Sequence, residues 1–187
     1  MLDLIKSMFK VNVFVNAMLF NVVWIACVAG SARSLIWPAV LSVGLLAAFQ
    51  LHPKNRHPND LRLVWISLLM GIFVDSIWIQ LGWMDFTEKR PFFGLAPAWI
   101  VLLWIGFALT INHSLKWLMA HPALPALVGG IAAPITYFAG IKIGAVIYTE
   151  SVLLVSIGLG VAWAISLTIL VEVGKKSKHG VALEPTK

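Results

Sequence analysis

Six long apolar segments, separated by short polar connectors, limit most strongly what this chain can fold into. A helix needs about 20 mostly apolar residues to cross the hydrocarbon core of a bilayer. The segments cover residues 11–29, 35–51, 61–83, 97–117, 124–148 and 152–173. Backbone polar groups in hydrocarbon must be bonded internally, which favours helices. The sequence therefore predicts an all-α, polytopic transmembrane bundle of about six helices in one domain, residues 1–174, with a polar cytoplasmic tail, residues 175–187.

The composition excludes a soluble domain. Apolar residues make up 60% of the chain and charged residues only 12%, whereas soluble domains are about half apolar and about a quarter charged. The net charge of +6 comes from short clusters between the apolar segments, and a nucleic-acid-binding surface would gather basic residues on one face. The predicted partner is the lipid bilayer, not nucleic acid.

The basic residues also predict the topology. With six helices, Lys and Arg fall ten to one side and three to the other. The ten are Lys6, Lys10, Lys54, Arg56, Arg62, Lys116, Lys175, Lys176, Lys178 and Lys187, and the three are Arg33, Lys89 and Arg90. Because cytoplasmic loops are richer in Lys and Arg, both termini are expected in the cytoplasm.

The first apolar segment has two interpretations. Lys6 and Lys10 precede it, and small residues at 28–32 follow it, a pattern that also occurs in cleaved signal peptides. Residues 11–29 are nevertheless long enough to span a bilayer and include Asn12 and Asn16. An uncleaved first helix is the favoured prediction.

Two charged residues inside the predicted spans are the main candidates for a functional site. Asp75 lies in the third segment and Lys142 in the fifth, and a charge at a helix centre costs about 2.5–3.5 kcal/mol on insertion scales. At 1.5 Å per residue both lie roughly 20–25 Å from the cytoplasmic start of their helices. An ion pair is allowed if the two helices are neighbours. The alternatives are a purely structural pair, a ligand-binding or gating pair, and a Lys142 that extends to the outer interface.

Other polar residues add weaker candidates. Asn16 is placed to hydrogen-bond to a neighbouring helix or to contact a ligand. Gln80 and Glu150, at the predicted outer end, are expected near the mouth of a vestibule, and Tyr137 is a further ligand-binding candidate in the fifth segment. His113, near the inner end of the fourth segment, is interpreted as an interfacial residue or a proton relay.

Motifs for covalent or metal-assisted chemistry are missing from the sequence. There is no phosphate-binding loop, dinucleotide fingerprint, metal-spaced His and Cys cluster or nucleophile elbow. No catalytic residue, metal site or cofactor is therefore predicted, and a non-enzymatic role is favoured while the enzyme question stays open.

Three stretches carry a resemblance to a known family. They are residues 71–76 (GIFVDS), residues 97–108, which begin with Pro-Ala-Trp-Ile, and residues 129–140, which run from Gly-Gly to Pro-Ile-Thr-Tyr-Phe-Ala-Gly. Together they resemble a bacterial inner-membrane family known as domain of unknown function 2878. The resemblance covers most of the chain and implies a bacterial cytoplasmic-membrane setting. Relatives are often encoded beside lipid-modifying enzymes, which implies a link to membrane lipids.

Two functions follow as hypotheses. The first is a membrane component that binds or transports a small molecule or lipid, with Asp75 and Lys142 at its site. The second is a non-catalytic scaffold or accessory subunit for lipid-modifying enzymes, with a protein partner or a second copy as its contact. An intramembrane lipid enzyme is the least favoured alternative.

Overall fold

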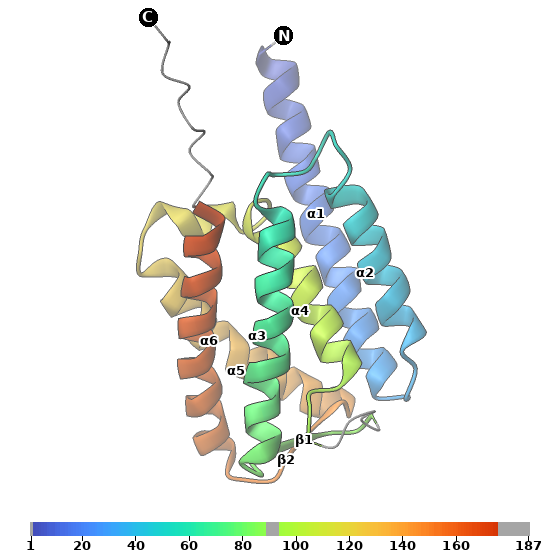
Figure 1. The fold of residues 1–187 in the computed structure, drawn as a ribbon, viewed down its shortest axis with the longest axis vertical. Helices are drawn as coiled ribbons and strands as arrows, with labels where there is room; N and C mark the ends of the chain where they lie inside the picture. Colours follow the sequence, from blue (N-terminus) through green and yellow to red (C-terminus); the bar gives the residue numbers. More distant parts are fainter. Residues whose placement is uncertain (1, 89–93, 176–187) are drawn as a thin grey trace, which may run out of the picture.

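Six α-helices run alternately in opposite directions and form one bundle (Figure 1). The computed structural model describes residues 2–88 and 94–175, with side chains from residue 11 onward. The helices are α1 (Leu2–Ser31), α2 (Trp37–Gln50), α3 (Asp60–Gln80), α4 (Ala98–Ile111), α5 (Leu124–Ile143) and α6 (Val152–Lys175). The predicted all-α helical bundle is confirmed. Lys89, Arg90 and the predicted tail beyond Lys175 lie outside the described residues.

Four of these helices are long and apolar enough to cross a membrane: α1 from Val11 onward, α3, α5 and α6. Their outward faces carry large apolar side chains, among them Phe73 (69% exposed) and Leu153 (72% exposed). Soluble monomers rarely expose contiguous apolar surface on this scale. Length and surface together identify a multi-pass membrane protein.

Helices α2 and α4 are shorter than their predicted segments. Each has 14 residues, which is about 21 Å against a hydrocarbon core of about 30 Å. Pro38 stands in the first turn of α2, and α4 ends before Asn112. The last part of the predicted fourth span instead forms a turn and a short 3₁₀ helix, η1 (Lys116–Ala120).

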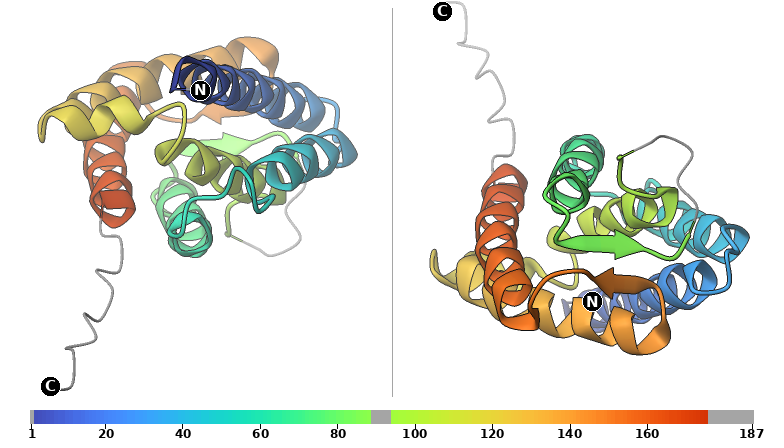
Figure 2. Two further views of the ribbon diagram at one scale, coloured as in Figure 1. Left: turned by 90° about the horizontal axis from the view of Figure 1, so that it is seen from above. Right: turned by 90° about the horizontal axis from the view of Figure 1, so that it is seen from below.

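The fifth helix also ends earlier than predicted. Gly144 has a φ of +90°, a left-handed conformation that glycine tolerates and that ends helices. The following residues form strand β2 (Val146–Tyr148), which pairs antiparallel with β1 (Met84–Phe86). The two strands lie side by side across one end of the bundle (Figure 2). We refer to this end as the strand end, and to the opposite end, where α1 begins and α6 stops, as the termini end.

Helix α4 lies in the middle of the bundle, as the view from above shows (Figure 2). It contacts α1, α2, α3 and α6. Its buried side chains include Trp99, Trp104 and Leu109. The sequence predicts six similar membrane-spanning segments and does not indicate which of them is central. In the structure α4 is the helix that other helices surround on most sides.

Helices α5 and α6 form the closest pair, and glycines allow this approach. A Cβ atom at Gly129 would overlap the backbone carbonyl of Trp163, and one at Gly160 would lie 3.0 Å from the carbonyl oxygen of Gly130. Small residues at such contacts let helix backbones approach in membranes.

Candidate functional site

A cavity of about 370 Å³ lies between α1, α4, α5 and α6. Seven aromatic side chains form much of its wall, and its few polar groups come mainly from hydroxyl-bearing residues. The aromatic residues are Phe20, Trp24, Trp99, Trp104, Phe107, Tyr137 and Trp163. None of the described residues that line the cavity carries a charge. Its size falls in the range of about 300–1,000 Å³ that is typical of ligand pockets.

The cavity opens sideways, between α1 and α5. These two helices make little contact with each other. Ala132 and Thr136 of α5 line the cavity and are exposed, and Phe20 and Trp24 of α1 line it and are half-buried. Since α1 and α5 both have membrane-spanning length, the opening faces the bilayer.

Asp75 lies behind the cavity wall. It is fully buried, and its two carboxylate oxygens each accept one hydrogen bond. The Trp104 indole N–H donates to one oxygen at 2.7 Å, and the Tyr137 hydroxyl donates to the other at 2.5 Å. Trp104 also stacks on Trp163, with ring centroids 4.4 Å apart. The carboxylate thereby fixes two rings of the cavity wall.

The ion pair between Asp75 and Lys142 that the sequence allowed does not form. Lys142 is exposed, and its ammonium lies 5.1 Å from the ring centroid of Phe138. Within the described residues, the ion pairs involve other side chains. The buried face of α5 carries Ala133, Tyr137 and Gly140, and Lys142 is about 200° around the helix from Gly140. Lys142 therefore points away from the bundle.

This arrangement predicts different results for two substitutions. Tyr137→Phe should lower the free energy of unfolding by about 1–2 kcal/mol, because it removes a hydrogen bond to a buried carboxylate. Lys142→Met should leave stability unchanged, because it removes only an exposed contact. Thermal melting of the purified protein in detergent measures both. A Lys142→Met variant that melts as early as Tyr137→Phe would contradict the placement of Lys142.

Two other predicted site residues lie at the strand end, away from the cavity lining. Gln80 is exposed and donates through its amide nitrogen to the carbonyl of Gly94 at 2.9 Å. Glu150 is exposed in the link between β2 and α6. The structure therefore brings Asp75 and Tyr137 together, and it leaves Gln80, Glu150 and Lys142 apart from them.

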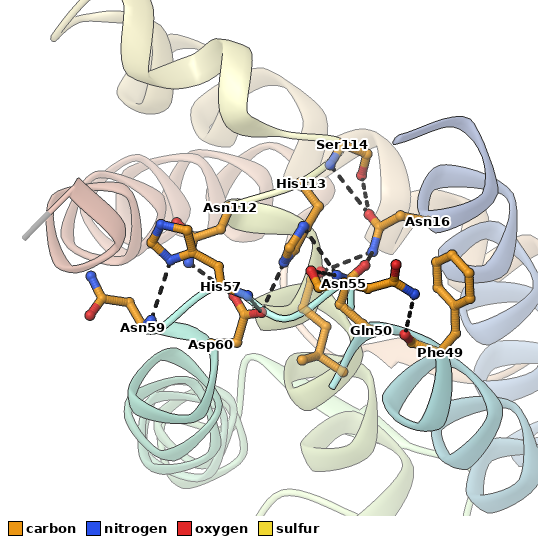
Figure 3. A network of polar contacts seen from close by, with 11 residues as sticks. Asn16, Phe49, Gln50, Asn55, His57, Asn59, Asp60, Asn112, His113 and Ser114 are labelled. Atoms are coloured by element: carbon orange, nitrogen blue, oxygen red, sulfur yellow. Dashed lines mark hydrogen bonds and ion pairs between the residues drawn. The ribbon is translucent and has the colours of Figure 1, made fainter. Parts of the chain in front are cut away.

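Asn16 belongs to a second polar site, at the termini end (Figure 3). At its centre is Asp60, which is fully buried at the start of α3. Its carboxylate accepts hydrogen bonds from the His57 backbone N–H at 2.8 Å and from the Asn112 amide at 3.0 Å, and its Oδ2 lies 2.9 Å from Nε2 of His113. Side chains from α1, α2 and α3, from the turn that follows α4 and from the loop at 51–59 thus meet at one end of the bundle.

The directions of the hydrogen bonds in this network follow from two backbone groups. The Asn16 amide nitrogen donates to the Leu109 carbonyl, and the Asn16 carbonyl accepts from the backbone N–H and the hydroxyl of Ser114. Asn16 then donates to Oε1 of Gln50 at 2.7 Å.

The orientation of Gln50 in turn defines the state of His113. The Gln50 amide nitrogen donates to the Asn55 carbonyl and lies 3.1 Å from Nδ1 of His113. Because an amide nitrogen can only donate, Nδ1 accepts, and Nε2–H donates to Asp60. His113 is therefore neutral in this arrangement, with its proton on Nε2.

The network differs from a nucleophilic triad, although Ser, His and Asp all occur in it. Both ring nitrogens of His113 are engaged by Gln50 and Asp60, and the Ser114 hydroxyl donates to Asn16 at 2.6 Å. His113 thus has no free nitrogen to act as a base toward Ser114. The described residues also contain no group of three or more His, Cys, Asp or Glu arranged to hold a metal.

One neighbouring histidine is electrostatically perturbed. The pKa of His57 is lowered, first because the ring is partly buried and also because the Lys116 ammonium is near, while the Asp60 carboxylate opposes this effect. The lowered pKa favours the neutral ring, whose Nδ1 accepts from the Asn59 backbone N–H at 3.3 Å.

Sequence reasoning missed several members of both sites. Trp104 gave no signal, because an indole in an apolar segment looks like any other core residue. Asp60, Gln50 and Asn55 were assigned to helix ends and a loop. A signal was present in the clustering of Asn, Gln, His and Asp at and beside two connectors that lie at the same predicted membrane level, residues 51–60 and 112–116.

The fold and the sites together define a multi-pass helical membrane protein with an apolar cavity open to the side and a buried polar network at one end. Residues 13–169 match the family described as "Protein of unknown function (DUF2878)". The chain belongs to this family, and the resemblance seen in the sequence is confirmed. No curated protein and no solved structure matches the chain.

Proposed function

We propose that this protein is a membrane component that binds an elongated apolar molecule, a lipid or a lipid-like small molecule, which enters from the bilayer between α1 and α5. The observation that carries the proposal is the aromatic-lined cavity of about 370 Å³ and its lateral opening. A water-soluble solute would have to enter the hydrocarbon of the bilayer before it could reach such an opening. A lipid is already there.

The shape of the cavity supports an elongated ligand. Its lining runs along α5 from Val128 to Gly140 and along α1 from Ala17 to Val28, which corresponds to about 16–18 Å at 1.5 Å per residue. This is about half of a hydrocarbon core of about 30 Å. A chain of one leaflet therefore matches the cavity in length.

In this proposal Asp75 and Tyr137 keep the side chains of the cavity wall in place. Asn16 belongs to the polar network at the cytoplasmic end of the cavity. Ser114 lines the cavity and is bonded to Asn16, so the polar network reaches the cavity at the termini end. The basic residues near that end support a cytoplasmic position for both termini. The family resemblance supports a bacterial cytoplasmic membrane as the location. Transport of the ligand, and a scaffold role beside lipid-modifying enzymes, stay predictions from the sequence.

The test uses a lipid with a photoreactive diazirine near the end of its acyl chain, incorporated into nanodiscs with the protein. Mass spectrometry of the labelled peptides should find label on lining residues of the central helix such as Leu103 and Phe107, which lie behind the opening. Ala132→Phe, which places a ring at the mouth of the cavity, should reduce this labelling about tenfold.

Ile131→Phe is the matched control. Ile131 is the neighbouring residue, is 58% exposed and does not line the cavity, so a ring there should leave the labelling of α4 unchanged. Label confined to outward-facing residues, or equal loss in both variants, would refute the proposal.

A further inference from the structure

The cavity lies next to a buried carboxyl group that no cation pairs with among the described residues. Asp75 is fully buried, and within the described residues it forms no ion pair with Lys, Arg or His. Its hydrogen-bond donors, Trp104 and Tyr137, are both uncharged. An ionisable residue at membrane depth without a partner is costly and usually has a functional reason.

A single layer of side chains separates the Asp75 carboxylate from the cavity. Trp104 and Tyr137 contact Asp75 on one side and line the cavity on the other. Hydrogen bonds from neutral donors stabilise a carboxylate but do not cancel its charge, and in a medium of low dielectric its field extends farther than in water. The potential inside the cavity is therefore biased toward negative values when Asp75 is ionised.

The wall itself favours positive charge in the same region. Trp104, Trp163 and Phe107 form one aromatic group, with Trp104 stacked on Trp163 and Phe107 edge-on to Trp163 at 5.4 Å. The faces of aromatic rings attract cations, Trp most strongly. The described lining residues include no Lys or Arg that would repel a cation, and Lys142 points away from the bundle.

We infer that the ligand is a lipophilic cation: an amphiphile whose ammonium or other positively charged group lies against the Trp104, Trp163 and Tyr137 wall, with its apolar chain along the cavity. The inference rests on the proposed function and deepens it by naming the class of ligand. A carboxylate behind an aromatic wall selects against an anion of the same length and has no comparable preference for a neutral amphiphile.

The test is a competition between three amphiphiles that share a dodecyl chain: dodecyltrimethylammonium, dodecanol and dodecanoate. Each competes with the diazirine lipid for labelling of α4 in phosphatidylcholine nanodiscs, and concentrations are corrected for partition into protein-free nanodiscs. The cation should compete about tenfold more strongly than the alcohol, which corresponds to about 1.4 kcal/mol. Dodecanoate should compete most weakly.

Two variants locate the source of the preference. Asp75→Asn should reduce both the advantage of the cation and the disadvantage of dodecanoate relative to the alcohol, because only the aromatic rings then favour positive charge, while the alcohol still competes. Lys142→Gln changes a charge outside the cavity and should retain the wild-type order. If Asp75→Asn does not fold, the order of the three competitors on the wild-type protein still decides the inference.

The two proposals fail in different ways. Absence of cavity labelling in the wild-type protein overturns the proposed function. Labelling that all three amphiphiles displace equally, or that dodecanoate displaces best, retains the binding function and overturns the cationic ligand class.

Discussion

Replacement of Asp60 by alanine is expected to lower the free energy of unfolding by about 3–5 kcal/mol, because three hydrogen-bond donors lose their shared acceptor. The variant leaves three donors at the termini end without an acceptor: the His57 backbone N–H, the Asn112 amide and the His113 imidazole. Each buried donor without a partner costs about 1–3 kcal/mol. The midpoint of thermal melting in detergent should fall by about 10 °C or more, and accumulation in the membrane should drop.

Glu172→Ala is the matched control for this prediction. Glu172 is an exposed carboxylate near the same end of the bundle, and it pairs with Lys175 three residues later. An exposed pair of this kind contributes about 0.5 kcal/mol or less. Equal melting of the Asp60→Ala and Glu172→Ala variants would show that the network does not hold the termini end together.

Asp60→Asn tests the hydrogen-bond directions in the same network. An asparagine has nearly the same shape as aspartate, but its amide nitrogen would face one of the three donors. His113 cannot relieve the conflict by changing tautomer, because Nδ1 already accepts from Gln50. The asparagine variant should therefore recover only part of the lost stability. Full recovery would show that Asn112 turns its amide and accepts from the new side chain, because Asn112 Oδ1 has no hydrogen-bond partner among the described residues.

Replacement of Gly129 by alanine is expected to cost about 3 kcal/mol, the upper part of the range for overpacking. A Cβ atom at this position would overlap the backbone oxygen of Trp163 and lie 2.9 Å from the carbonyl carbon of the same residue. A backbone atom cannot rotate away as a side chain can, so α5 and α6 must separate. Trp163 lines the cavity, and its displacement should also reduce the labelling of α4 described above.

Gly44→Ala is also a glycine-to-alanine substitution, but it is expected to stabilise the protein slightly. Gly44 lies within α2, and no atom other than those of its chain neighbours and its own helix backbone lies within 4 Å of a Cβ built there. Alanine inside a helix is favoured over glycine by about 0.5–1 kcal/mol, so this variant should melt slightly higher than the wild-type protein. Both variants can be compared in one melting series. A Gly129→Ala variant as stable as Gly44→Ala would contradict the close contact between α5 and α6.

The residues behind the two largest expected effects, Asp60 and Gly129, could be recognised from the sequence to different degrees. Gly129 and Gly130 stood in a stretch that resembled the family, but nothing in the sequence named Trp163 as their contact. Asp60 looked like the last residue of a polar loop. It is buried because the end of α4 and the loop at 51–59 close over it, and such closure depends on segments far apart in the chain.

The sequence by itself determined the class of this protein, because hydropathy and helix length are local quantities that the bilayer converts directly into spans. It also indicated that Lys142 and Gly140 face opposite sides of one helix, because that follows from helix geometry. Only the tertiary structure decided which side packs inward, and so placed Tyr137 against Asp75 and left Lys142 exposed. The depth of a residue in the membrane follows from its position in the chain, whereas the rotation and the neighbours of its helix depend on how all six helices pack.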